Sequence, residues 1–136
     1  MAAGAKVPPV LRGDWSARSG YELAGRLLDL NVTAAFVAND SMALGLLRGL
    51  NERGREVPGD LSIVGFDDLP EAAYFTPPLT TVRQDFAEVG RRSLQRLLAQ
   101  IQSAPAAPTR IIIPPELVVR GSTGPFRAAR RVRAGV

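Results

Sequence analysis

The sequence predicts an α/β fold in which a parallel sheet is flanked by helices on both faces. Two short runs of apolar residues, 34–38 and 61–66, are separated by a single helical segment. Short, uniformly apolar strands that alternate with helices are typical of parallel sheets covered on both faces. We therefore expect residues 13–78 to form the parallel part, with the two runs adjacent in one right-handed βαβ unit.

Three helices are predicted from apolar residues that recur three and four positions apart. The expected helices are residues 16–30, capped by Ser16, residues 41–53, ended by Gly54, and residues 85–102. The second helix buries a stripe made of Ala43, Leu46, Leu47 and Leu50, and leaves Leu44 off that stripe. The third helix opens with DFAE, a capping box with aspartate in place of serine or threonine.

Three further segments are predicted to be extended. VPPVL (7–11) has prolines that suit the edge of a sheet. LTTVRQ (79–84) has the composition of a strand, and IIIPPELVVR (111–120) is interpreted as two short strands around Pro114 and Pro115.

The composition excludes several classes of chemistry. The 136 residues include no cysteine and no histidine, so disulfides, Cys or His metal ligands and His-based acid–base catalysis are ruled out. No phosphate-binding or nucleophile motif is present either. We therefore expect no enzymatic activity, no catalytic residue, no metal and no cofactor. The N-terminus lacks the apolar segment of a secretory signal, and no run is long enough to cross a membrane, which predicts a cytoplasmic location.

The net charge of +4 is concentrated at the C-terminus. Residues 120–136 hold five arginines and no acidic residue, whereas the rest of the chain holds 12 basic and 13 acidic residues. A basic segment of this kind can contact nucleic acid, but a solvated terminus is the simpler interpretation. We expect residues 124–136 to be a disordered basic tail.

Polar pairs follow both predicted central strands. Asn39 and Asp40 end the first strand, and Asp67 and Asp68 end the second. In open parallel sheets, ligands bind beyond the carboxyl ends of the strands, which predicts a crevice at these residues. Asp40 is expected to cap the following helix, which leaves Asn39 as either a turn residue or a ligand contact.

Successive side chains of a strand point apart, so only one of Asp67 and Asp68 can face a crevice. The alternative is a solvated pair of turn residues. Trp15 is the single tryptophan and lies in the polar stretch RGDWSARSGY. It is either a packing residue at the start of a helix or a flat surface on which a sugar or base can stack.

The segment AAFVANDSMALGLLRGLNERGREVPGDLSIVGFDDLPEAAYFTPPLTTVRQDFAEVGRRSLQRLL, followed by PPELVVRGST, resembles the LacI/GalR family of transcriptional regulators. The resemblance runs from about Gly13 to Thr123 and corresponds to the C-terminal effector-binding region. It implies part of a periplasmic-binding-protein-like (type I) sensor domain. It also implies a small-molecule effector, usually a carbohydrate, held between two lobes.

The resemblance also assigns roles to individual residues. Trp15 would pack on the apolar face of a sugar, and Asn39 and Asp67 would bind its hydroxyls. A homodimer would form through the helix at 41–53 and the segment at 72–78, which places Leu44, Tyr74 and Phe75 in the interface. Contact with DNA would be made by a helix-turn-helix that this sequence does not contain.

The same resemblance divides residues 1–136 into parts of two lobes. Residues 13–78 and 115–123 would belong to the C-terminal lobe, and residues 79–114 to the N-terminal lobe. The expected function is the ligand-sensing and dimerisation part of a regulator. Two alternatives remain open at this point, namely an inactive gene remnant and a sugar-binding protein for transport.

Overall fold

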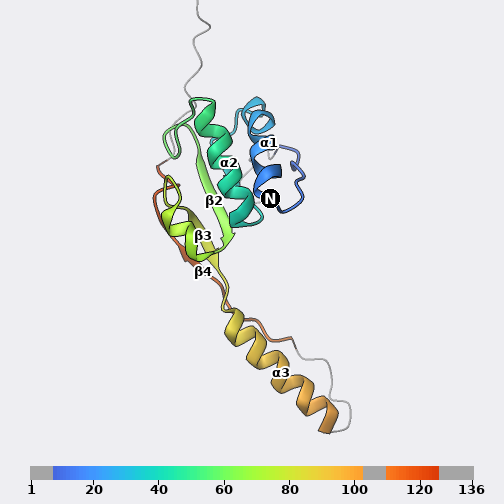
Figure 1. Ribbon diagram of the computed structural model, residues 1–136. Coiled ribbons are helices and arrows are strands. Elements are labelled where there is room, and N and C mark those ends of the chain that lie inside the picture. The colour runs from blue at the N-terminus through green and yellow to red at the C-terminus, as the bar shows by residue number, and fades with distance from the viewer. Residues whose placement is uncertain (1–7, 103–109, 126–136) are drawn as a thin grey trace, which may run out of the picture.

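Two helices pack side by side on one face of a four-stranded sheet, and a third helix extends away from them (Figure 1). The computed structural model describes residues 8–102 and 110–125. The packed helices are α1 (Ala17–Asp29) and α2 (Asp40–Glu52), and the extending helix is α3 (Phe86–Gln102). A short 3-10 helix, η1 (Pro70–Tyr74), follows the second strand. Within the described residues, no helix is long and apolar enough to span a membrane.

The sheet confirms the predicted parallel pair and adds two strands to it. Its order is β1 (Ala34–Phe36), β2 (Ser62–Asp67), β3 (Thr80–Arg83) and β4 (Glu116–Val118). β1 and β3 both run parallel to β2, whereas β4 is antiparallel to β3. The carboxyl ends of β1, β2 and β3 therefore lie at one edge of the sheet, as the strand-end argument requires.

Glycines allow α1 and α2 to approach each other at backbone distance. A Cβ atom added at Gly45 would lie 1.7 Å from the carbonyl oxygen of Ala17, and one at Gly20 would lie 2.0 Å from that of Met42. Any larger residue at either position would force the helices apart. This close packing fixes the start of α2 relative to the residues that precede α1.

The predicted core stripe of α2 is confirmed. Ala43 and Leu50 are completely buried, and Leu46 and Leu47 nearly so, whereas Leu44 is 44% exposed. Ile63 on β2 completes the centre of the core. Ser16 caps α1, because its hydroxyl accepts a hydrogen bond from the Ser19 N–H.

The two faces of the sheet differ, which corrects the prediction that both are covered. Ile63 and Gly65 point toward α2 and are buried, whereas Phe36 points to the other face and is 65% exposed. The Phe36 and Phe66 rings contact each other edge to face on that outer side, with centroids 6.1 Å apart. Apolar strand residues therefore face outward where no helix of the described residues covers them.

Two of the segments predicted to be extended form no strand within the described residues. Residues 8–11 are irregular and pair with no strand, and residues 110–115 contain no strand before β4. Proline lacks the backbone N–H that a ladder needs, which explains why residues 8–11 and the segment before β4 do not pair. Ile111 and Ile113 instead lie beside α3, where they line a small hollow with Val89.

Helix α3 forms as predicted, but none of its residues is buried. Asp85 caps it by accepting the Glu88 N–H at 2.8 Å. Its apolar stripe is exposed, from 42% at Val89 to 72% at Ile101. The helix stands apart from α1 and α2 in Figure 1, and among the described residues Ile111 and Ile113 line a hollow beside it. The division into two lobes stays a prediction, and residues 126–136 of the predicted tail lie outside the described residues.

Candidate functional site

Asn39 caps α2, which corrects the assignment of that role to Asp40. The Asn39 side-chain oxygen accepts the Met42 N–H at 2.8 Å, and its backbone is extended, as a cap residue requires. Its amide nitrogen donates to the carbonyl oxygen of Trp15 at 3.0 Å. An asparagine side chain can donate twice and accept twice. Asn39 therefore keeps one donor and one acceptor position for a ligand after both protein contacts are made.

Asp40 is instead a buried tie between three elements. Its side chain is completely buried and accepts from the Thr81 hydroxyl at 2.6 Å and from the Leu69 N–H at 2.8 Å. Gly65 makes room for it, because a Cβ atom there would lie 2.3 Å from an Asp40 oxygen. Asp40 thus fastens the start of α2 to β3 and to the turn that follows β2.

Asp67, the last residue of β2, and Asp68, the residue after it, have different partners, as the alternation of side chains predicts. An Asp67 oxygen accepts from the Gln84 amide at 3.4 Å. Burial, together with the nearby carboxylate of Asp40, raises the pKa of Asp67 above its ordinary value. A carboxylate that is partly desolvated and holds one long hydrogen bond is well suited to accept hydrogen bonds from a ligand.

Asp68 is occupied by structural ion pairs. It accepts from Arg83 on β3 and from Arg120 after β4, each at 2.6 Å. Burial raises the pKa of Asp68, but the hydrogen bonds from Arg120 and Arg83 outweigh this and hold it below its ordinary value. We therefore name the set Asp68, Arg83 and Arg120 the arginine brace, and assign it a role in holding β2, β3 and β4 together.

Trp15 has an unusual backbone conformation. Its φ angle is 72°, and its side chain is 64% exposed. Asp67 and Asp68 also have positive φ, at 106° and 54°. The described part of the chain has four non-glycine residues with positive φ. Three of them, Trp15, Asp67 and Asp68, are predicted site residues or direct neighbours of one. Strained backbone of this kind gathers at binding sites, where the surrounding structure maintains it.

The three predicted effector residues have the following arrangement. The Asn39 amide donates to the backbone carbonyl of Trp15, and Asn39 and Asp67 lie at the carboxyl ends of the adjacent parallel strands β1 and β2. Gln84, which follows β3, also reaches Asp67 and was missed by the sequence analysis. The strand-end rule applied to a third parallel strand would have found it. A flat ring, amide donors and a carboxylate acceptor are group types that suit a polyhydroxylated ligand, and their joint role as a binding site stays a prediction.

The predicted interface residues differ in exposure. Tyr74 is 86% exposed and Leu44 is 44% exposed, whereas Phe75 is partly buried and packs against the core. Their role in a dimer stays a prediction.

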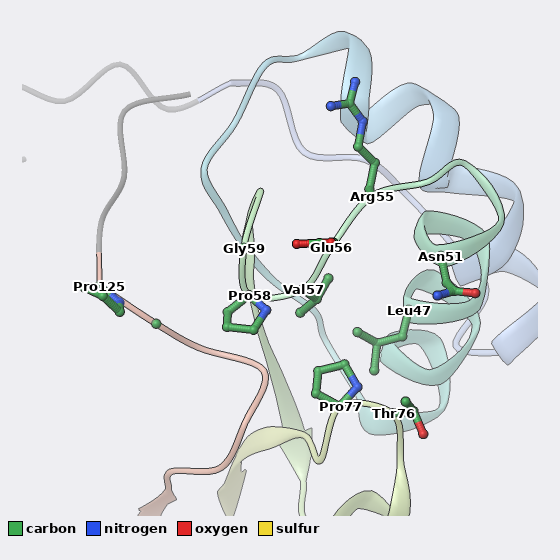
Figure 2. Close-up of a pocket in the computed structure, with 11 residues that line it drawn as sticks. Leu47, Asn51, Arg55, Glu56, Val57, Pro58, Gly59, Thr76, Pro77 and Pro125 are labelled. Carbon is green, nitrogen blue, oxygen red and sulfur yellow. The ribbon is translucent and has the colours of Figure 1, made fainter. Parts of the chain in front are cut away.

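A separate hollow of about 480 Å³ lies near the amino ends of β2 and β3 (Figure 2). Leu47, Val57 and Pro77 gather at its centre, while the Arg55 side chain points away from them. It contains none of Trp15, Asn39 and Asp67 and lies at the opposite end of the strands. The described residues hold no group of three or more acidic side chains that could bind a metal ion.

The fold and its polar strand ends define part of a periplasmic-binding-protein-like domain. Consistent with this, the family model described as "Periplasmic binding protein-like domain" matches residues 3–123. The chain belongs to this family.

Relatives of known sequence and structure share this part of the chain. The lactose operon repressor of Klebsiella pneumoniae is 44% identical over 119 residues, which cover 86% of this chain and 33% of the repressor. A LacI family transcriptional regulator from Enterococcus faecium, solved with bound ribose, is 37% identical with a TM-score of 0.74. The match covers 83% of this chain and 42% of that one.

The lac repressor dimer bound to operator and the anti-inducer ONPF is 42% identical with a TM-score of 0.74. The match covers 82% of this chain and 39% of that chain. The chain thus spans about a third of the length of the curated relatives it matches.

Proposed function

We propose that this chain is the effector-sensing part of a LacI-type transcriptional regulator and binds a carbohydrate at Trp15, Asn39 and Asp67. The observation that carries the proposal is the hydrogen bond between Asn39 and the Trp15 carbonyl at the carboxyl ends of the parallel strands that also end near Asp67. Trp15 and Asp67 both have positive φ angles there. A relative with the same fold has been solved with ribose. The Trp15 ring would cover the apolar face of the sugar, and Asn39 and Asp67 would bind its hydroxyls.

The affinity of the described residues for a free sugar should be weak. Asn39 spends half of its hydrogen-bonding capacity on Met42 and Trp15, and Asp67 already accepts from Gln84. A site built from one side of a crevice therefore makes few hydrogen bonds, each worth about 1 kcal/mol. We expect a dissociation constant of about 1 mM or weaker, equivalent to about −4 kcal/mol.

Trp15 fluorescence provides the measurement, because Trp15 is the single tryptophan of the sequence. The full chain is titrated with ribose, lactose and cellobiose up to about 50 mM. We expect at least one sugar to change the emission saturably. Asp67→Asn keeps the side-chain volume but removes the charged acceptor, so the dissociation constant should rise about tenfold, the equivalent of about 1.4 kcal/mol.

Asp60→Asn is the matched control, because Asp60 precedes β2 and so lies at the opposite end of the same strand from Asp67. It should leave sugar binding unchanged. Equal effects of the two substitutions, or no response to any of the sugars, would contradict the proposal. Thermal unfolding of Asp67→Asn supplies an internal check, since removal of a partly buried carboxylate near Asp40 should not lower stability.

We also propose that two copies pair through the surface that carries Leu44 and Tyr74. Both side chains are exposed, Leu44 on α2 and Tyr74 on η1. A related lac repressor has been solved as a dimer. Phe75 would contribute by supporting this surface from below, since it packs on the core.

A further inference from the structure

Asp67, the carboxylate proposed to bind the effector, has little support of its own. Among the described residues its side chain accepts one hydrogen bond, from Gln84 at 3.4 Å. Its backbone φ of 106° is a conformation that residues with a side chain rarely adopt, and Asp68 follows with a φ of 54°. Such conformations persist only where the surrounding structure maintains them. The direction of the Asp67 side chain therefore depends on how the turn from Asp67 to Leu69 is held.

Contacts made by its neighbours hold this turn. Before the turn, Asp67 is the last β2 residue paired with β3. After it, the Leu69 N–H donates to Asp40 at 2.8 Å. Between these two points the side chain of Asp68 is 8% exposed and pairs with both arginines of the arginine brace, at 2.6 Å each. The brace thus fixes the middle of the turn, at the residue next to Asp67.

Arg120 is itself fixed at both ends. Its backbone N–H donates to the Thr80 hydroxyl oxygen at 2.9 Å, and one guanidinium nitrogen donates to the Leu79 carbonyl at 2.8 Å. A second guanidinium nitrogen reaches Asp68, and the side chain is 17% exposed. A largely buried arginine with these partners is better suited to hold Asp68 in one position than to contact a ligand.

Arg83 connects the brace to the hydrogen-bond partner of Asp67. It pairs with Asp68 at 2.6 Å and with Glu116 at 3.2 Å, which fixes the end of β3. Gln84 is the next residue in the chain. Both partners of the Asp67–Gln84 hydrogen bond are therefore chain neighbours of brace residues, since Asp67 precedes Asp68 and Gln84 follows Arg83.

We propose that Arg83 and Arg120 are positioning residues of the effector site, which act through Asp68 to keep the Asp67 carboxylate facing the crevice. The inference rests on the proposed function, because it concerns the carboxylate that would bind the sugar. Neither arginine would contact the sugar. The ladder already pairs β2 with β3 and β3 with β4, so the effect of the brace on the turn can be separated from the assembly of the sheet.

Titration of the Asp67 carboxyl by NMR, on the full chain, tests the positioning without any sugar. Burial and the nearby Asp40 raise the pKa of Asp67 in the wild type. Arg120→Met should let the turn relax and the carboxylate move into water, so the pKa of Asp67 should fall toward its ordinary value. Loss of a nearby positive charge would by itself raise the pKa of a carboxyl group, so a fall separates the two effects. A pKa of Asp67 that is unchanged or higher in the variant would overturn the proposal.

The fluorescence of Trp15 measures the effect on sugar binding. For the sugar that binds the wild type most tightly, Arg120→Met should raise the dissociation constant about tenfold, the low end of what supporting residues contribute at metal sites. Arg120→Lys keeps a charged donor for Asp68 and should restore most of the affinity. A dissociation constant of Arg120→Met equal to that of the wild type would overturn the proposal.

Arg83→Met keeps the test decisive if Arg120→Met does not fold. Arg83 is 49% exposed, so its loss should leave the fold intact, and it should shift the pKa of Asp67 and the affinity in the same directions. Arg91→Met is the matched control, because Arg91 is 54% exposed and pairs with Glu88 at 2.7 Å on α3. Equal effects of the two substitutions would overturn the proposal.

The two proposals fail in distinguishable ways. If no sugar binds the wild type, the proposed function fails, and the titration of Asp67 in the variants still decides whether the arginines position it. If a sugar binds the wild type and the variants equally well, with the pKa of Asp67 unchanged, the effector site stands and the positioning role of the brace is refuted.

Discussion

Replacement of Asp40 by alanine should remove much of the stability of the fold. The carboxylate accepts from the Thr81 hydroxyl at 2.6 Å and from the Leu69 N–H at 2.8 Å, and both Asp40 and Thr81 are completely buried. Asp40→Ala leaves the completely buried Thr81 hydroxyl and the partly buried Leu69 N–H without their partner. Each unpaired buried donor costs about 1–3 kcal/mol. We expect a loss of about 3–5 kcal/mol, a large part of the stability of a small domain.

Urea unfolding followed by circular dichroism measures this loss. Thr81→Val keeps the shape of the side chain and removes one donor, so it should cost about 1.5–3 kcal/mol. The double variant should be less unstable than the sum of the two single ones, by about 1–2 kcal/mol, because both remove the same hydrogen bond. Asp60→Ala is the control, since Asp60 accepts one N–H at an exposed turn. A cost below about 1 kcal/mol for Asp40→Ala, or additive single effects, would refute the structural role of the tie.

Three further outcomes follow from the fold. The hydrogen bond from Arg120 holds the pKa of Asp68 below its ordinary value. The ion pair therefore stabilises the fold above pH 3.8, the ordinary pKa of aspartate, and this stabilisation is lost as the pH falls through the lower pKa of Asp68 in the folded state. Arg120→Met should therefore be less stable than the wild type at pH 7, and the difference measured by urea unfolding should narrow below about pH 4. Leu44→Ala should convert a dimer to a monomer in equilibrium sedimentation by removing apolar contact area, and a wild type that is monomeric at high concentration would count against the interface. Amides of residues 86–102 should exchange faster than those of residues 34–66, because α3 buries no residue, and equal protection in a monomer would show that α3 is stabilised independently.

The sequence predicted the elements that depend on local pattern. The apolar runs at 34–38 and 61–66 gave the parallel pair, and helix periodicity gave α1, α2 and α3 within one or two residues. These features follow from residues close together in the chain, so a window of sequence contains the information that determines them.

The assignments that failed depend on distant contacts. Asparagine and aspartate both cap helices, so residue type could not decide between Asn39 and Asp40. The decision comes from Thr81, which lies on β3 and binds the Asp40 carboxylate, leaving Asn39 as the cap. The outer face of the sheet shows a similar limit. An apolar residue such as Phe36 indicates a surface that favours burial, but it does not indicate which segment covers that surface, and Phe36 is exposed in the described chain.

The arginine brace has a mechanical consequence for the connection to α3. The chain leaves the sheet toward α3 along β3 and returns along β4, and these strands are antiparallel neighbours. Asp68 pairs with Arg83 on β3 and with Arg120, two residues after β4, so both segments are tied to the same residue at the end of β2. A force applied to either strand would therefore be transmitted to the other through Asp68. We therefore expect any bending between the sheet and α3 to occur beyond these ion pairs, at Gln84 and Asp85 on one side and at residues 110–115 on the other.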